Sequence, residues 1–349
     1  MSEPLTIALD AMGGDNAPGI VIKGANIARR RFPDVRFLIF GDEPKIKSLM
    51  RKMPALIAAC SIVHTEKVIT SETKPSQAVR QGKGSSMQLA IDSVRVGNAA
   101  GVVSAGNTGA LMAMSKLGLR MLPGIDRPAI AGVFPTLRNE LVMLDLGANV
   151  ECDADNLIQF AVMGGIFSRA VLGVLNPVVG LLNVGTEHVK GNSAVREAAT
   201  ILSDSSYPIS FHGFVEGDDI GKGTVDVVVA DGFSGNIALK TLEGTVRLYS
   251  DYLRNAFKSS LASRLGYMLA RRGLNKLRAR LDPRRYNGAM FVGLNGIVVK
   301  SHGGTDAFGF ANAIGVAIDM ASNSLNERIT QELASHGADD TVKAHAAAS

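Results

Sequence analysis

The sequence has no tryptophan, two cysteines and six histidines, and aromatic residues make up only 5% of it. Two cysteines cannot build a disulfide framework, and Cys60 and Cys152 do not form a C-x-x-C pair. The histidines are scattered, without an H-x-x-x-H pair or a Cys/His cluster, so the sequence predicts no metal site.

Nucleotide-binding and targeting signals are missing as well. Neither G-x-G-x-x-G nor G-x-x-x-x-G-K-[ST] occurs, which argues against a dinucleotide fold and against a P-loop. Residues 1–6 show no signal peptide. Residues 96–115 carry no charge but contain asparagines and glycines, which indicates a buried strand and turn rather than a membrane span. We therefore expect a cytoplasmic protein.

What the chain does contain is ample apolar material. Hydrophobic residues make up 46% and charged residues 20% of 349 residues, so disorder is excluded as the main state. A chain of this length buries roughly three quarters of its unfolded surface. The 38 glycines exceed the ~7% norm, and without a collagen period they must lie in turns.

One pattern recurs along the chain: a short apolar run, a turn rich in Gly, Ser, Asn and Asp, and then a helical stretch. Such runs are typical of parallel strands buried on both faces, so the pattern predicts an α/β fold with helices on both sides of a mostly parallel sheet. We expect one catalytic domain over residues 1–335 and a flexible tail over 336–349. The expected strands are Leu5–Leu9, Gly101–Val103, Leu141–Leu144, Val178–Leu182 and Val225–Val229.

The turns after these strands are the candidate site. Ligands of α/β sheets bind beyond the carboxyl ends of the strands, and backbone N–H groups at glycines and helix starts attract anions. Taken singly, each turn is a weak signal. Helix capping explains the first turn better, with Asp15 or Asn16 capping a helix over Pro18–Arg31. Capping is also the alternative for Thr108, at the next helix, and for Asn236, at a helix over Ile237–Leu248. Five such turns in succession indicate a cleft for an anionic substrate and a developing oxyanion.

The segment 247–285 is different in character. It holds eleven basic residues against two acids, and its apolar residues follow helical spacing. Gly273 interrupts the pattern, which Leu274 then resumes, so we predict two helices that form a basic amphipathic hairpin. Elsewhere Cys152 could be proposed as a nucleophile, but a buried inert thiol is the commoner case, and we predict a structural role.

At this point several strings resemble one family. ALDAMGGDNAPG, SAGNTGALM, GIDRPA, LDLGANV, GLLNVGTE followed by KGN, VADGFSGNIALKTLEG and KSHGG are similar to the PlsX-type phosphate acyltransferases of bacterial phospholipid synthesis. The resemblance runs from about Leu5 to Asn326 in the family's order. It implies a fold like that of phosphate acetyltransferases and isopropylmalate dehydrogenases, and a homodimer.

The resemblance also implies a reaction. Inorganic phosphate attacks the thioester of a fatty acyl group on acyl carrier protein, and the acyl phosphate passes to a glycerol-phosphate acyltransferase in the membrane. Lys190 and Asn236 match the family's catalytic positions. Phosphate is itself the nucleophile, so we expect no covalent intermediate on the enzyme and no cofactor. We place the phosphate among Asp10, Gly13, Gly14, Asn107 and Thr108, with His302 as a further candidate that a packing role explains better.

The hairpin has three interpretations. The family uses it for dimerisation and for peripheral membrane attachment, and arginines near the cleft are expected to dock the acidic carrier protein. The alternative is a helix pair that packs in a dimer and is otherwise solvated. The residues expected to meet an anionic membrane are Leu261, Leu265, Met268, Leu269, Arg271 and Arg272.

Two rival functions remain open. An NAD-dependent dehydrogenase of the related fold would need clustered aspartates for a metal, and the spacing of Asp145, Asp153 and Asp155 is not a known metal signature. A nucleic-acid-binding protein would use the basic segment, but that segment lacks interleaved aromatics and a recognised module, so we expect no nucleic-acid partner.

Overall fold

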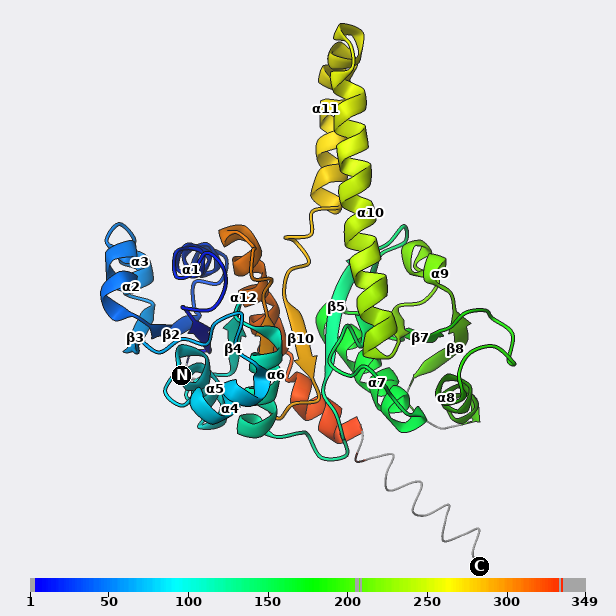
Figure 1. Ribbon diagram of the computed structural model, residues 1–349, viewed down its shortest axis with the longest axis horizontal. Helices are drawn as coiled ribbons and strands as arrows, with labels where there is room; N and C mark the ends of the chain where they lie inside the picture. The colour runs from blue at the N-terminus through cyan, green and yellow to red at the C-terminus, as the bar shows by residue number, and fades with distance from the viewer. Residues whose placement is uncertain (1–3, 205–206, 208, 333, 335–349) are drawn as a thin grey trace, which may run out of the picture.

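The computed structural model describes residues 4–204, 207, 209–332 and 334 (Figure 1). The short apolar runs form the strands of one sheet. They are β1 (Thr6–Asp10), β2 (Arg36–Gly41), β3 (Cys60–His64), β4 (Gly101–Ser104), β5 (Ala129–Pro135), β6 (Glu140–Leu144), β7 (Val178–Leu182), β8 (Ser210–Val215), β9 (Val227–Val229), β10 (Ala289–Val292) and β11 (Ile297–Lys300).

Helices fill most of the connections between the strands. They are α1 (Gly19–Arg31), α2 (Glu43–Met50), α3 (Pro54–Ile57), α4 (Pro75–Gln81), α5 (Ser86–Arg95), α6 (Thr108–Leu119), α7 (Ala154–Phe167) continued by a π-helical turn η1 (Ser168–Leu172), α8 (Ser193–Asp204), α9 (Gly217–Lys222), α10 (Gly232–Lys258), α11 (Leu261–Arg280) and α12 (Ala307–Ser322).

The sheet has 11 strands in the order β3-β2-β1-β4-β11-β10-β5-β6-β9-β7-β8. Strand β10 runs antiparallel to both β11 and β5, and β5 runs antiparallel to β6. The other neighbouring pairs are parallel. The sheet therefore contains two parallel blocks, β3-β2-β1-β4-β11 and β6-β9-β7-β8. They run in opposite directions, and β10 and β5 lie between them.

Helices cover both faces of the sheet and bury two apolar layers. One layer is formed with α1, α7, α8 and α12, where Phe160, Phe167 and Phe310 are fully buried. The other is formed with α4, α5 and α6, and with the first half of α10 through Leu239 and Leu242. This three-layer, mostly parallel architecture confirms the predicted fold class (Figure 1).

The predicted strands are confirmed to within two residues at each end, and the helix expected from Pro18 begins at Gly19. One helix was predicted too short, because α10 extends over Gly232–Lys258 instead of Ile237–Leu248. The single domain over 1–335 stays a prediction, and the tail over 336–349 lies outside the described residues.

The helical hairpin is formed by α10 and α11 and projects from the rest of the molecule (Figure 1). Its turn lies at Ser259 and Ser260, where the Ser260 hydroxyl accepts from Ser263 N at 3.0 Å and caps α11. The break expected at Gly273 is wrong, because Gly273 lies inside α11. One glycine inside a helix costs only about 1 kcal/mol relative to alanine.

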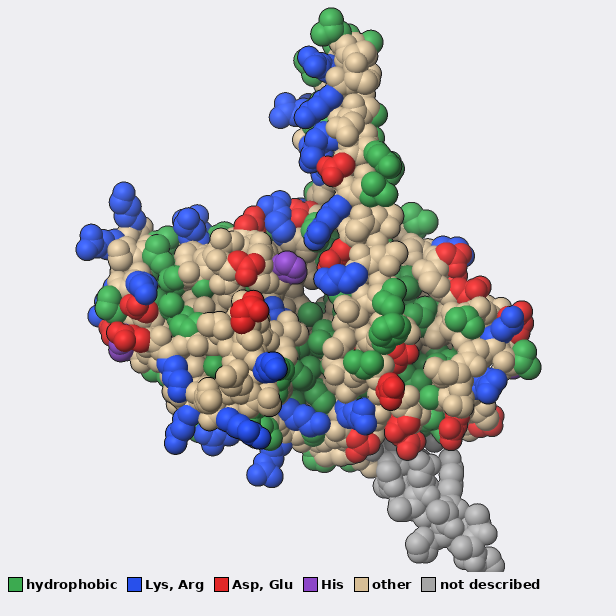
Figure 2. Space-filling model, in the orientation of Figure 1, with side chains coloured by type: hydrophobic (Ala, Val, Ile, Leu, Met, Phe, Trp, Pro, Cys, Tyr) green, Lys and Arg blue, Asp and Glu red, His purple; other side chains and the backbone are tan. Residues whose placement is uncertain are grey.

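Much of the hairpin surface is exposed and basic (Figure 2). No residue of α11 is buried, and on α10 only Gly232 and Gly235 are buried. Apolar side chains therefore face solvent on both helices. Within the described part of the chain, every helix is too short or too polar to cross a bilayer.

Candidate active site

The strand reversal divides the candidate turns into two groups. The first group follows β1, β4 and β11, whose last residues lie side by side because Ser104 pairs with Asp10 on one side and with Lys300 on the other. The second group follows β6, β7 and β9, where Val229 pairs with both Leu144 and Leu181.

In the first group, the Asp10 carboxyl is buried inside the turns. Its Oδ2 accepts from the Ser104 hydroxyl at 2.7 Å, and its Oδ1 accepts from Met12 N at 3.3 Å. Burial raises the pKa of this carboxyl, while hydrogen bonds from Ser86 and Ser104 act in the opposite sense. Asp10 therefore connects the turns after β1 and β4 instead of facing the solvent.

The two adjacent glycines of the first turn are required by close backbone approaches. A Cβ on Gly13 would lie 2.5 Å from Asp10 Oδ2 and 2.7 Å from Gly106 N. Gly14 has a φ of +103°, and a Cβ there would lie 2.9 Å from Ala105 Cβ. Neither position accepts a side chain, so the turns after β1 and β4 are in backbone contact.

The polar candidates beside these turns differ in whether their hydrogen-bond donors are free to bind a ligand. Asn107, not Thr108, caps α6, and its amide nitrogen donates to the carbonyls of Ser71 and Thr73 at 2.8 and 3.0 Å. Thr108 is exposed. The exposed His302 accepts from Gly304 N at its Nδ1 over 3.2 Å, so its neutral ring carries the proton on Nε2. Thr108 and His302 therefore present donors to solvent, whereas Asn107 holds a neighbouring loop.

In the second group, the buried Asp145 organises the turn after β6. Its Oδ1 accepts from Ile130 N and Ala148 N at 2.9 and 3.0 Å, and its Oδ2 accepts from Asn149 N at 2.7 Å. Burial raises the pKa of Asp145, and these backbone donors partly reverse that effect. The oxygens of Asp145, which was considered above as a metal ligand, thus accept hydrogen bonds from backbone N–H groups.

Helix α10 begins directly against this turn. Its cap is Asp231, which accepts from Ser234 N at 2.8 Å, so Asn236 is not the cap and lies one turn further along the helix. A Cβ on Gly235 would lie 1.9 Å from the Asp145 carbonyl oxygen, and a Cβ on Gly147 would lie 3.6 Å from Asn236 Cβ. The exposed Asn236 side chain is therefore held beside the turn after β6.

Lys190 lies on the turn after β7. The turn is closed by Lys190 N donating to Glu187 O at 2.9 Å and by the Asn183 amide donating to Lys190 O at 3.2 Å. Lys190 is exposed, and no carboxylate of the described residues forms an ion pair with it. Since β7 and β9 are parallel neighbours in register, Lys190 and Asn236 leave the same edge of the sheet.

The structure brings the turns of the first group into contact and places the second group on turns after neighbouring parallel strands. Asp10, Gly13 and Gly14 meet the turn before Asn107 and Thr108, and His302 follows the adjacent strand β11. Lys190 and Asn236 share the other edge. The contacts that join these residues stay within the two groups.

Two buried residues at these strand ends were missed as site candidates. Lys300 ends the apolar strand Ile-Val-Val-Lys with 9% of its surface exposed, and Asp145 directly follows β6 with none exposed. A charged residue that closes a short apolar strand was the available signal for both.

Cys152 fits the predicted structural role. It is half-buried, and burial together with the Asp145 carboxylate raises the pKa of its thiol to about 11. A thiol with this pKa stays protonated at neutral pH, so it is a poor nucleophile.

The architecture is shared by solved phosphotransacetylases. A phosphotransacetylase from Streptococcus pyogenes superposes with a TM-score of 0.63 at 18% identity over 92% of this chain and 95% of its own. The EutD phosphotransacetylase from Staphylococcus aureus gives 0.58 at 18% identity over 91% and 94%. At this identity the likeness shows the fold, which defines an α/β protein of the phosphotransacetylase type.

The relatives in sequence identify the family. A family model described as "Fatty acid synthesis protein" matches residues 5–328. Phosphate acyltransferases from Rhodospirillum centenum and Paramagnetospirillum magneticum are 63% and 61% identical, over 96% and 95% of this chain and 94% and 95% of theirs. The chain belongs to the phosphate acyltransferase family, which confirms the resemblance and the enzyme class. These relatives favour neither a dehydrogenase nor a nucleic-acid-binding protein.

Replacing Gly235 with alanine tests the close contact between α10 and the backbone of Asp145. We expect Gly235→Ala to lower the free energy of unfolding by about 1–3 kcal/mol, because the new methyl group overlaps the Asp145 carbonyl. Displacement of Asn236 should lower the acyltransferase rate as well. Chemical denaturation and initial rates measure the two effects.

The matched control is Gly244→Ala on the same helix, where a Cβ would meet nothing within 4 Å. It should raise helix stability by up to about 1 kcal/mol and leave the rate unchanged. Wild-type stability and rate in Gly235→Ala would contradict the contact.

Proposed function

We propose that this chain transfers a fatty acyl group from acyl carrier protein to inorganic phosphate, giving acyl phosphate and free carrier. The observation that carries the proposal is that Lys190 and Asn236 are both exposed on turns that follow neighbouring parallel strands, in a chain from the phosphate acyltransferase family, and that Lys190 has no ion pair among the described residues. The Gly-rich turns after β1, β4 and β11, with their close backbone contacts, make up the first group of loops.

In this proposal the two loop groups form opposite walls of one site. Neighbouring strands are rotated by about 20–25° with respect to each other, so the four steps from β4 to β6 rotate the sheet by about 80–100°. Such a rotation turns the carboxyl ends of two antiparallel blocks toward a common side. Figure 2 shows a furrow between the parts of the molecule that contain the two parallel blocks, as this arrangement requires.

In the proposed reaction the protein forms no covalent bond to the substrate. An oxygen of the phosphate dianion forms a bond to the thioester carbon, the carbon–sulfur bond breaks, and the thiolate takes a proton from solvent. Lys190 offsets the negative charge of the phosphate or of the oxyanion. The Asn236 amide donates to the oxyanion, a type of contact worth roughly 3 kcal/mol in enzymes that have an oxyanion hole.

Substitutions at the two exposed residues test these roles. We expect Lys190→Met and Asn236→Asp to lower kcat/KM by about 100-fold, because one removes the cation and the other removes the amide donor without changing the shape. Initial rates of carrier release with long-chain acyl carrier protein and phosphate measure the effect.

The control is Asn255→Ala, an exposed asparagine further along α10, which should leave the rate unchanged. Melting temperatures should be alike in all variants, since the three side chains are exposed. Wild-type rates in both site variants would remove the assignment of Lys190 and Asn236.

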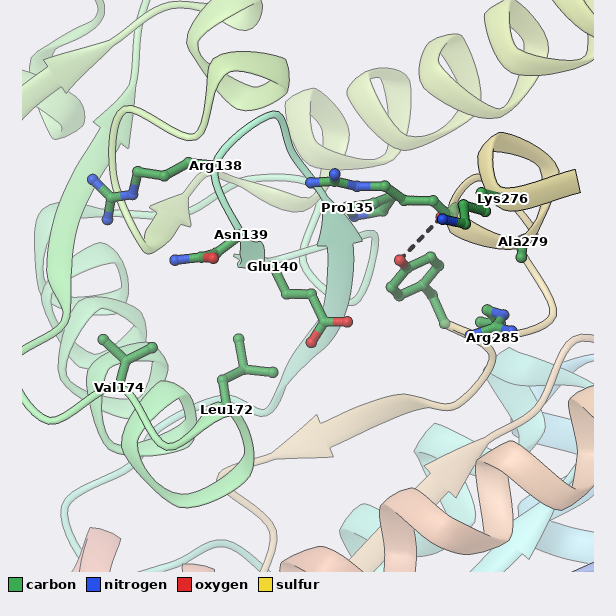
Figure 3. A pocket seen from close by; sticks show the side chains of 11 residues that line it. Pro135, Arg138, Asn139, Glu140, Leu172, Val174, Lys276, Ala279 and Arg285 are labelled. Atoms are coloured by element: carbon green, nitrogen blue, oxygen red, sulfur yellow. Dashed lines mark hydrogen bonds between the residues drawn. The ribbon is translucent and has the colours of Figure 1, made fainter. Parts of the chain in front are cut away.

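We place the carrier protein at the foot of the hairpin. A pocket of about 860 Å³ lies there between α11 and the β5–β6 turn, and Arg138, Lys276 and Arg285 line it together with Glu140 (Figure 3). Arg280 joins the two elements by donating to Thr136 O at 2.7 Å. The excess of cations suits an acidic protein, and a second copy of the chain would bring like charges to the same place.

The position of this pocket suits a carrier that presents its thioester on a long flexible arm. Glu140 begins β6 and Asp145 follows its end, so the pocket lies about 17 Å from the turn that holds Asn236. Helix α10 extends between the two places.

The hairpin tip is proposed to attach peripherally to an anionic membrane. Leu261, Met268 and Leu269 are 81%, 70% and 82% exposed near the turn, with Leu265 beside them. Arg271 and Arg272 follow on the same helix and are exposed. Apolar side chains that enter the acyl region and arginines at headgroup level are the composition of an interfacial helix.

In this proposal the protein is cytoplasmic and attaches to the membrane surface. It would then release acyl phosphate close to the glycerol-phosphate acyltransferase in the membrane. Homodimerisation is part of the same proposal, because Leu248, Tyr249 and Tyr252 on α10 are exposed below the tip and suit a second copy of the hairpin.

The membrane proposal predicts two separable effects on sedimentation with vesicles. Arg271→Glu with Arg272→Glu should weaken binding to phosphatidylglycerol vesicles at low salt, and the difference should shrink at high salt. Leu261→Ser with Leu269→Ser should weaken binding at every salt concentration, because the lost contacts are apolar.

Arg51→Glu with Lys52→Glu is the control of equal net charge, at exposed positions after α2. It should bind as the wild type does. Vesicle binding by the Arg271/Arg272 variant equal to that of this control would refute the electrostatic part of the proposal.

A further inference from the structure

Lys300 is a buried lysine at the centre of the first loop group. It ends β11, pairs with Ser104 of β4, and lies among apolar strand residues of which Val298 and Val299 are fully buried. Burying an ammonium ion costs several kcal/mol unless polar partners surround it. Nothing in the packing of an apolar strand requires a lysine at this position.

Lys300 has hydrogen bonds to backbone carbonyls but no direct ion pair among the described residues. Its Nζ donates to Ser301 O and, at 3.4 Å, to Ala105 O. An ammonium group has three N–H donors, and among the described residues no carboxylate lies within ion-pair distance of it. Burial lowers the pKa of Lys300 to about 8, and the more distant carboxylates of Asp15 and Asp10 act against that decrease.

Three glycine turns meet around one acceptor of this ammonium group. A Cβ on Gly14 would lie 2.9 Å from Ala105 Cβ, and one on Gly303 would lie 3.6 Å from Ala105 O. Asp15 N donates to Gly303 O at 3.1 Å. Lys300 thus lies where the turns after β1, β4 and β11 converge.

An anionic ligand at these turns would need the positive charge of Lys300, because two carboxylates lie near it. Asp10 and Asp15 both act on Lys300 electrostatically, and alone they would repel a phosphate dianion. A buried ammonium group near them offsets that repulsion, and one of its three N–H donors has no hydrogen-bond partner among the described residues.

We propose that Lys300 is the buried cation that binds inorganic phosphate at the turns after β1, β4 and β11. The inference rests on the proposed function and names its phosphate subsite. Lys300 then acts before the chemical step, by binding the nucleophile, while Lys190 and Asn236 act on the thioester from the other wall.

The first test separates phosphate binding from the rest of the reaction. Lys300→Met should raise the KM for phosphate by about tenfold or more and leave the KM for the acyl carrier substrate within about twofold. Lys300→Arg keeps the charge and should restore much of the phosphate affinity. Lys45→Met, which removes one exposed lysine charge on α2, should change neither constant.

The second test uses the charge of the lysine directly. Lys300 is protonated below about pH 8, so the wild-type KM for phosphate should rise as the pH increases above that value. Arginine stays charged over this range, so the KM of Lys300→Arg should stay flat. The other titratable groups nearby, Asp10, Asp15 and His302, are present in both proteins and cancel in the comparison.

Calorimetric titration of inorganic phosphate without acyl donor makes the result independent of turnover. Weaker phosphate binding by Lys300→Met supports the subsite even if the acyl transfer were not observed, in which case only the proposed function fails. If Lys300→Met does not fold, the pH dependence of Lys300→Arg against the wild type decides.

Either of two outcomes would overturn the assignment. One is a Lys300→Met protein that binds phosphate with wild-type affinity while kcat or the melting temperature falls, which a purely structural lysine predicts. The other is an identical pH dependence of the phosphate KM in the wild type and in Lys300→Arg.

Discussion

The hydrogen bonds of the buried Asp145 carboxylate are the interaction on which the turn after β6, one wall of the proposed site, depends. The carboxylate accepts hydrogen bonds from the backbone of β5, at Ile130, and from the turn after β6, at Ala148 and Asn149. Those bonds shape the turn against which the first residues of α10 pack, so closely that Gly232 and Gly235 have no room for a Cβ. One carboxylate thereby joins the antiparallel centre of the sheet to the helix that carries Asn236.

Helix α10 extends that constraint over a long distance. It begins beside Asp145 and ends at Lys258, next to the hairpin turn, and its 27 residues span about 40 Å. The proposed oxyanion donor and the proposed membrane contact therefore lie on one continuous helix. A continuous helix of this kind would hold the proposed oxyanion donor and the proposed membrane contact at a set separation.

Several local features were predictable because they depend on neighbours in sequence. The apolar runs became strands near their predicted bounds, and the helical spacing in 247–285 became a hairpin. Predictions failed where a longer contact decided the outcome. Helix α10 begins five residues earlier than expected because Asp231 caps it and its glycines fit against the turn that Asp145 organises.

The sequence by itself determined the fold class, the family and the set of polar residues that follow the strands, because strand periodicity and motif spelling are local properties. Only the tertiary structure decided how those residues are divided. The antiparallel strands β5 and β10 reverse the sheet and separate Asp10, Gly13 and Gly14 from Lys190 and Asn236. It also decided that Asn107 holds a loop and that Lys300 is buried beside two carboxylates, since burial and charge proximity arise from contacts between segments far apart in the chain.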